Sequence, residues 1–171
     1  MGKLVFITGG VRSGKSRRGL ELAEAGGGRV LFVATALASD REMEERIRKH
    51  RAERPGGWRT VEAVSGKLSE ALFPEGEEIV LLDCLGLYVS RRMMEGASGE
   101  KAAGEALDAA LAAAAGFRLS IFVSNEVGWG LVPDNELGRM FTEALGAANR
   151  EVAAVADEVI LMVSGIPVKV K

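Results

Sequence analysis

Eight residues near the start of the chain have the types and spacing of a phosphate-binding loop. They follow the pattern G-x-x-x-x-G-K-S. Glycines let backbone N–H groups converge on phosphate oxygens, and the N-terminus of a following helix adds further donors. In such loops the lysine contacts the β- and γ-phosphates, and the serine hydroxyl holds Mg²⁺. The sequence therefore predicts that a nucleoside triphosphate binds through Gly9, Gly10, Val11, Arg12, Ser13, Gly14, Lys15 and Ser16.

The segments on either side of this loop suit it. The apolar run 4–7 predicts a buried strand, and residues 17–25 are compatible with a helix. A phosphate-binding loop needs a strand before it and a helix after it. This context argues against a chance match in a glycine-rich segment, but it does not determine the reaction.

Asp83 is a second candidate for metal binding. It ends the apolar run 79–82, which is the form of an aspartate that holds Mg²⁺ directly or through water in phosphate-loop enzymes. An aspartate here could instead cap the helix that follows. The phosphate-binding loop upstream favours the metal role, so Ser16 and Asp83 are the predicted Mg²⁺ ligands.

His50 is the only histidine, and it lies late in a highly charged predicted helix over residues 40–52. Met43, Ile47 and His50 have the spacing of one helix face. With so few apolar residues, this helix is expected to lie over a surface cleft, where its cations would attract a polyphosphate. His50 could be a nucleophile there or an exposed histidine at a helix end, and the residues alone favour the second interpretation.

Composition limits the class of protein. A length of 171 residues, with 47% hydrophobic and 27% charged residues, predicts one globular domain spanning residues 1–171. A net charge of −2 gives no reason to expect nucleic acid as a partner. The single cysteine, Cys84, is expected to be a buried structural thiol and suits the reducing cytoplasm. We expect no membrane span, because no run of apolar residues is long enough.

The elements that must position these residues alternate between strands and helices. Apolar runs of this kind predict a mostly parallel sheet with helices on both faces, an α/β three-layer fold of the P-loop NTPase type. Ligands in such folds bind at the carboxyl ends of the strands, where Asn125 and Glu126 are also expected. Pro167 is predicted to end the last strand. The expected strands are 4–7, 30–33, 58–62, 79–83, 119–124 and 159–163. The expected helices are 17–25, 40–52, 100–115 and 134–156, together with one that follows the strand 79–83 and runs through residue 94.

Three details of this pattern make specific predictions. Ser39 and Glu42 have the spacing of a capping box that would begin the charged helix. Leu137 begins an apolar stripe along the last long helix. Trp129, in a loop shaped by glycines and Pro133, is hard to explain as a core residue and suggests a ligand or subunit contact.

Several longer segments together are more distinctive than the phosphate-binding loop. They are ITGGVRSGKSR, ATA, DREMEERIRKHRAERPGGWRTVE, LLDCL, VSNEVGWGLVPDNELGRMF and GAANREVAAVADEVILMVSG. In this order, and over nearly the whole length, the chain resembles the bifunctional adenosylcobinamide kinase / adenosylcobinamide-phosphate guanylyltransferase family of cobalamin biosynthesis. It departs from the family pattern at Gly86 and Tyr88, where threonine and tryptophan are usual.

The resemblance implies a two-step enzyme. It would phosphorylate the corrinoid adenosylcobinamide with ATP or GTP, and then transfer GMP from GTP to that phosphate through a His50–GMP intermediate. The resemblance also implies that the protein forms a homo-oligomer, in this case a trimer. The implied catalytic residues are His50 and Lys15. Beyond the loop, the implied nucleotide contacts are Ala34, Thr35, Ala36, Arg51, Ala52, Glu53, Arg54, Glu62 and Asp83.

Two other functions are compatible with the loop and Asp83. A single-step P-loop kinase of another small alcohol would give His50 no covalent role, so labelling by GTP would separate it from the two-step enzyme. A nucleotide-dependent switch is disfavoured because the chain has no N-K-x-D motif for guanine recognition.

Overall fold

One seven-stranded sheet organises the chain, in a computed structural model that describes residues 1–38 and 41–171. The strand order is β3-β2-β4-β5-β1-β6-β7, and every pair is parallel except β6 with β7. The strands are β1 (Lys3–Gly9), β2 (Val30–Ala34), β3 (Arg59–Glu62), β4 (Ile79–Asp83), β5 (Leu119–Val123), β6 (Glu158–Val163) and β7 (Ile166–Lys169).

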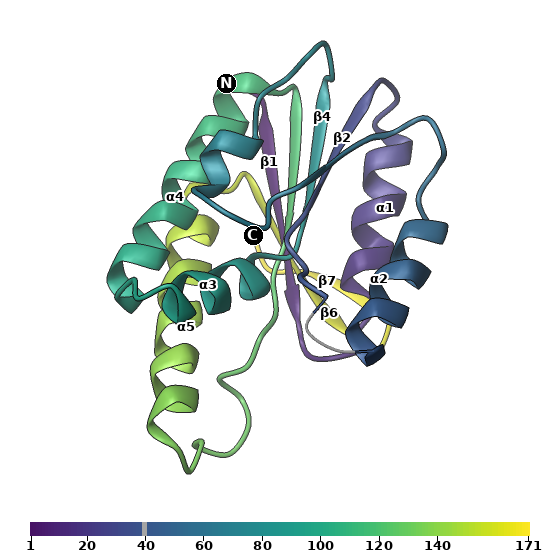
Figure 1. Ribbon diagram of the computed structural model, residues 1–171. Coiled ribbons are helices and arrows are strands. Elements are labelled where there is room, and N and C mark those ends of the chain that lie inside the picture. The colour runs from purple at the N-terminus through teal and green to yellow at the C-terminus, as the bar shows by residue number, and fades with distance from the viewer. Residues whose placement is uncertain (39–40) are drawn as a thin grey trace.

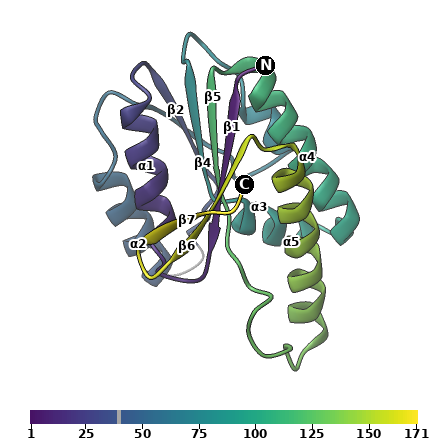
Figure 2. The same ribbon diagram turned by 180° about the vertical axis from the view of Figure 1, so that it is seen from behind.

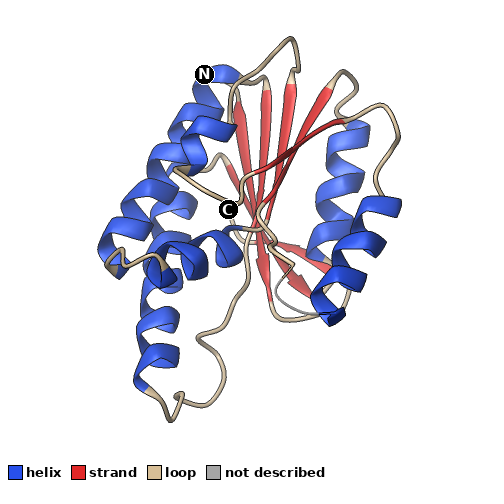
Figure 3. Cartoon of the chain, viewed as in Figure 1, coloured by secondary structure: helices blue, strands red, loops and turns tan. Residues whose placement is uncertain are grey.

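Helices cover both faces of this sheet (Figure 1, Figure 2). The elements α1 (Lys15–Ala25) and α2 (Arg41–Ala52) lie on one side. On the other side lie η1 (Leu68–Ala71), a 3₁₀ helix, with α3 (Leu85–Met94), α4 (Gly99–Gly116) and α5 (Glu136–Val155). Figure 3 shows the resulting three layers, which confirm the predicted α/β fold class.

The strands read as continuous apolar runs because both faces of the sheet are buried. Along β1, Leu4 and Phe6 belong to the core under α3, α4 and α5. Val5 and Ile7 belong to the core under α1. Successive side chains of a strand point to opposite faces, so two hydrophobic cores share each central strand.

The predicted elements are present, with bounds that differ by at most two residues, and one prediction at the C-terminus is wrong. Pro167 does not end the last strand. The chain turns at Ser164 and Gly165, which have φ angles of 51° and 86°, and returns as β7 with Pro167 opposite Met162. Proline is tolerated there because β7 is an edge strand, where a missing N–H group leaves no neighbouring strand unpaired. The capping box predicted at Ser39 lies outside the described residues.

The first turns of α5 extend past the sheet (Figure 1). The apolar stripe of this helix is buried at Leu145, Ala148 and Val152, but Leu137 is 63% exposed. We call the exposed side chains of this end the apolar tip. They are Trp129, Leu131, Val132, Leu137 and Met140.

No helix among the described residues has the length and apolar character needed to cross a membrane.

Candidate active site

The phosphate-binding loop joins β1 to α1, as the sequence predicts. Gly9 has a φ of 151°, and a Cβ atom there would lie 2.5 Å from the carbonyl oxygen of Met162, so only glycine fits. The Lys15 side chain is buried and turns back over the loop, where Nζ donates to the carbonyl oxygen of Gly10 at 2.6 Å. The loop is therefore a closed turn with an ammonium group held against its own backbone.

Three strand ends line up beside this loop. In the sheet register Ala34 is opposite Glu62 on one side and Asp83 on the other, so β3, β2 and β4 end at the same level. The next strand, β5, continues into Asn125 and Glu126, and the Glu126 N–H donates to the carbonyl oxygen of Gly9 at 2.9 Å. The sheet thus brings Glu62, Asp83 and the phosphate-binding loop together along one edge, the one formed by the carboxyl ends of its parallel strands.

Thr35 fixes the backbone that follows Asp83. Its hydroxyl donates to the Cys84 carbonyl oxygen at 2.6 Å and accepts from the Cys84 N–H at 2.8 Å. The Thr35 N–H also donates to the Asp83 carbonyl oxygen at 3.3 Å. Because both hydrogen-bonding functions of this hydroxyl are occupied by protein backbone, Thr35 contributes to the site by holding Asp83 in place. A nucleotide contact of Thr35 stays a prediction.

Cys84 is a buried free thiol, as expected. Burial raises the pKa of the thiol to about 12, and the nearby charge of Asp83 adds to this shift. The thiol is therefore protonated at neutral pH and has no nucleophilic role.

Arg54 connects the charged helix to the sheet. Its guanidinium lies 3.7 Å from the centroid of the Phe32 ring on β2. Burial lowers the pKa of Arg54, while the charge of Asp83 acts in the opposite direction. Arg51, at the end of α2, forms an ion pair with Glu62. Ala52 and Glu53 are exposed between these two arginines.

His50 lies in the last turn of α2. Met43, Ile47 and His50 are all half-buried, as expected for one helix face, and no described residue of α2 is fully buried. The helix begins near the carboxyl ends of the strands and runs back along the sheet (Figures 1 and 2). With a rise of about 1.5 Å per residue, His50 lies roughly 14 Å along α2 from Arg41. The structure therefore places His50 away from the phosphate-binding loop.

The residues at the edge suit Mg²⁺. Asp83 offers a half-exposed carboxylate, and Ser16 lies half-buried in the first turn of α1. Among the described residues, no cluster of three or more His, Cys, Asp and Glu side chains could hold a metal alone. Mg²⁺ typically uses one or two carboxylates together with substrate phosphates and water, so this sparse set of ligands fits it.

Sequence reasoning missed two groups that support the site. Phe32 provides the ring under Arg54, and only the strand register reveals which way it points. Asn149 on α5 donates to the Asn125 carbonyl oxygen at 3.0 Å and accepts from the Ser124 hydroxyl at 2.6 Å. A polar residue in phase with the buried stripe of α5 is the signal that could have identified Asn149.

Gly86 and Tyr88, the two residues at the start of α3 that depart from the family pattern, both have structural explanations. A Cβ atom at Gly86 would lie 3.1 Å from Asn125 Nδ2, so glycine leaves room for that side chain. Tyr88 is fully buried, and its hydroxyl donates to Glu105 at 2.8 Å.

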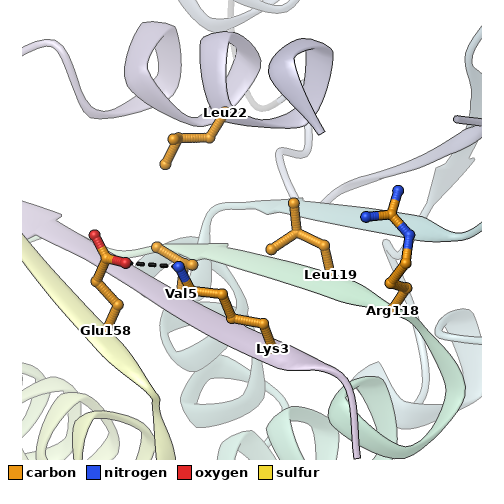
Figure 4. A pocket seen from close by; sticks show the side chains of 6 residues that line it. All are labelled: Lys3, Val5, Leu22, Arg118, Leu119 and Glu158. Atoms are coloured by element: carbon orange, nitrogen blue, oxygen red, sulfur yellow. Dashed lines mark hydrogen bonds and ion pairs between the residues drawn. The ribbon is translucent and has the colours of Figure 1, made fainter. Parts of the chain in front are cut away.

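A hollow opens under α1 at the other end of the sheet, where the parallel strands begin (Figure 4). Lys3, Leu119 and Glu158, the first residues of β1, β5 and β6, line it, and Lys3 forms an ion pair with Glu158 at 2.7 Å. Parallel α/β sheets bind ligands at the carboxyl ends of their strands, so we do not assign the reaction to this hollow.

Comparison with known proteins points to one family. The family model described as cobinamide kinase / cobinamide phosphate guanyltransferase matches residues 5–170. A Pseudomonas aeruginosa protein named bifunctional adenosylcobalamin biosynthesis protein CobP is 40% identical, covering 97% of this chain and 96% of its own length.

Two enterobacterial proteins give the same result. Both are named bifunctional adenosylcobalamin biosynthesis protein CobU. The Escherichia coli protein is 37% identical, and the Salmonella typhimurium protein is 36% identical. Each comparison covers 98% of this chain and 99% of the relative.

Proposed function

The chain belongs to the cobinamide kinase / cobinamide phosphate guanyltransferase family, and we propose that it catalyses both reactions of cobalamin biosynthesis. It phosphorylates adenosylcobinamide with ATP or GTP, and it then transfers GMP from GTP to adenosylcobinamide phosphate. The observation that carries this proposal is that the phosphate-binding loop and Asp83 meet at the carboxyl ends of the strands, while a second, basic element, α2, starts near these ends and bears His50 in its last turn.

In the kinase step, the loop binds the triphosphate and Lys15 contacts its β- and γ-phosphates. The alcohol oxygen of adenosylcobinamide attacks the γ-phosphorus, and the bond from that phosphorus to the β-phosphate oxygen breaks. Ser16 and Asp83 would hold Mg²⁺, which neutralises charge on the phosphates when bound. Thr35 keeps Asp83 at the strand end through its hydrogen bonds to Cys84.

In the second step, a ring nitrogen of His50 attacks the α-phosphorus of GTP. A nitrogen–phosphorus bond forms, the bond to the β-phosphate oxygen breaks, and pyrophosphate leaves. A phosphate oxygen of adenosylcobinamide phosphate then displaces His50 and receives the GMP group. The guanidinium groups of Arg51 and Arg54 offset the negative charge that moves to the leaving group.

Other residues of the edge have less specific roles in this proposal. Ala34, Ala36, Ala52 and Glu53 contact the nucleotide through their backbone. Glu62 binds either the guanine edge or the ribose of GTP.

This mechanism requires α2 to move. The loop binds triphosphate in both steps, but the structure has His50 far along a helix that runs away from the loop. The half-buried face of α2 and its ion pair with Glu62 are weak attachments, so a shift of the helix toward the loop costs little.

We also propose that the chain is a single cytoplasmic domain that forms a homo-oligomer, a trimer. The apolar tip supports self-association, because five large apolar side chains are exposed together.

Turnover with a defined substrate tests this function. Wild-type protein with adenosylcobinamide, Mg²⁺ and GTP should form adenosylcobinamide phosphate first and adenosylcobinamide-GDP second. Lys15→Ala should weaken both steps, whereas His50→Ala should stop only the second. Full retention of both steps by either variant, or no product from the wild type, would contradict the proposal.

A further inference from the structure

A hollow lies beside the phosphate-binding loop and takes no part in the two steps of the proposed mechanism. It lies between the first turns of α1 and the hairpin formed by β6 and β7, and these elements are adjacent in Figure 2. Its volume is about 530 Å³. Small-molecule sites span roughly 300–1,000 Å³, so this hollow is large enough for a nucleoside.

The walls combine positive charge with apolar surface. Arg12, Arg17 and Arg18 line the hollow, with Glu21 as the one carboxylate among the lining residues. Glu21 pairs with Arg17 at 3.1 Å and with Arg18 at 3.4 Å. The lining therefore keeps a net positive charge.

The opposite wall is the hairpin that the sequence did not predict. Met162 and Pro167 supply its apolar surface. The Gly165 N–H donates to the Ser13 carbonyl oxygen at 3.0 Å, which fixes the hairpin directly against the phosphate-binding loop. Since Arg12 and Gly14 of the loop also line the hollow, the phosphate site and the hollow are continuous.

The strand order determines which end of a triphosphate meets this hollow. Asp83 ends β4, on one side of β1, and the hairpin lies on the other side. Phosphoryl transfer requires the γ-phosphate to face Asp83 and the acceptor, so the nucleoside at the other end of the triphosphate must leave toward β6 and β7. In GMP transfer the α-phosphorus must instead face His50, which keeps that nucleoside on the α2 side.

We propose that the hollow between α1 and the β6–β7 hairpin binds the ribose and purine base of the triphosphate used in the kinase step. The nucleoside of the GMP donor lies on the other side of the loop, so the two nucleotides share one phosphate anchor and extend in opposite directions. One of the arginines that line the hollow (Arg12, Arg17 or Arg18) stacks on one face of the purine, and Pro167 packs against the other face. These two contacts recognise the base. This inference rests on the proposed two-step function.

A neutral, bulky substitution tests the inference by kinetics. Pro167→Trp should fill the hollow and raise the KM for ATP in the kinase step by about tenfold, with kcat little changed. Inhibition by inorganic tripolyphosphate, which has no nucleoside, should be unchanged, and so should GMP labelling of His50. Val170→Trp is the matched control, because Val170 is 64% exposed on the same terminal segment and does not line the hollow.

Two kinetic results would overturn the inference. One is an unchanged KM for ATP in a Pro167→Trp protein whose melting curve matches that of the wild type. The other is an equal loss of tripolyphosphate binding or of GMP labelling.

Photolabelling provides a test that needs no turnover. An azido-adenine analogue of ATP, bound to the wild-type protein with Mg²⁺ and irradiated, should label the peptide containing residues 158–171. Label confined to residues 41–62 would overturn the inference. Failure of the proposed function would appear separately, as absence of kinase turnover, while the labelled peptide still reports where the base binds.

Discussion

At the scale of single residues, the Thr35 hydroxyl is the most specific structural support of the site. It satisfies both the N–H and the carbonyl oxygen of buried Cys84. Thr35→Val keeps the shape but leaves the buried Cys84 N–H without its acceptor, and it leaves the Cys84 carbonyl oxygen with only the 3.4 Å hydrogen bond from the Tyr88 N–H. We therefore expect a loss of about 2 kcal/mol in the free energy of unfolding. Urea denaturation measures this change. Thr35→Ser retains the hydroxyl and should lose much less, and equal losses in both variants would contradict the assignment.

A buried carboxylate should make stability depend on pH. Glu105 accepts hydrogen bonds from Arg92 at 2.7 and 2.9 Å, and this pairing lowers the pKa of Glu105 from 4.5 to about 2. Because the pKa is lower in the folded state, the stabilisation is complete above pH 4.5 and is lost as the pH falls toward 2. It amounts to at most about 3 kcal/mol.

The measurement compares Glu105→Gln with the wild type across this range. The variant should have a lower free energy of unfolding than the wild type at neutral pH, and this difference should become smaller as the pH falls below 4.5. Asp108→Asn, an exposed position on the same helix, should follow the wild type. If the difference in the free energy of unfolding stayed constant down to pH 2, the charge of the Glu105 carboxylate would not be the source of the stabilisation.

Residue types and spacing were enough to predict the phosphate-binding loop and Asp83, because that chemistry is local in sequence. They could not predict that Arg54 stacks on Phe32 or that Thr35 bonds to Cys84. These contacts join residues from separate elements, and they depend on how the strands are ordered in the sheet. The sequence indicated a charged helix over the surface, but not that this helix, α2, runs away from the loop before it reaches His50.

At the scale of elements, α2 is attached more loosely than the other helices. None of its described residues is fully buried, whereas α4 buries eight residues against the sheet and its neighbours. Amide hydrogen exchange in α2 should therefore be at least about tenfold faster than in α4. GTP with Mg²⁺ should slow exchange in α2 if the helix closes over the nucleotide.

The same exchange experiment has an internal control. Lys15→Ala should remove the effect of GTP on α2 without changing exchange in α4. Equal rates in the two helices, or no response of α2 to GTP in the wild type, would contradict a mobile α2.

The predicted elements agree well with the structure because apolar runs and glycine breaks are strong signals in an α/β chain. The β6–β7 hairpin was missed because proline usually ends a strand. The Ser164-Gly165 pair between two apolar runs is a hairpin signal, and it would have identified β7. The exposed start of α5 follows from its position beyond the sheet, which helical periodicity alone does not reveal.

At the scale of the whole molecule, the apolar tip is the surface that we expect to form the contact between subunits. Leu131 is 97% exposed, and Val132 is 81% exposed beside it. We predict that Leu131→Asp shifts the protein to a smaller species in sedimentation or light-scattering measurements. Met94→Asp, at an 81% exposed position on α3, should leave the assembly unchanged. A wild-type protein that is monomeric at all concentrations would contradict the proposed homo-oligomer.

The whole sheet also explains how one loop can serve two reactions. Its order places the phosphate-binding loop between the ends of β3, β2 and β4 on one side and the β6–β7 hairpin on the other. The α2 side carries His50, Arg51 and Arg54, and the hairpin side carries the hollow proposed for the nucleoside of the kinase step. In the proposed mechanism the loop therefore holds the phosphates in both reactions, and the two nucleosides extend from it in opposite directions.

The most direct test of the two-step mechanism is covalent labelling. The wild-type protein is incubated with Mg²⁺ and GTP radiolabelled at its α-phosphorus, and the modified peptide is then mapped. We predict an acid-labile, base-stable label on His50 that is absent from His50→Ala. It should be released when adenosylcobinamide phosphate is added. No label on the wild type, or undiminished label on His50→Ala, would contradict the His50 intermediate.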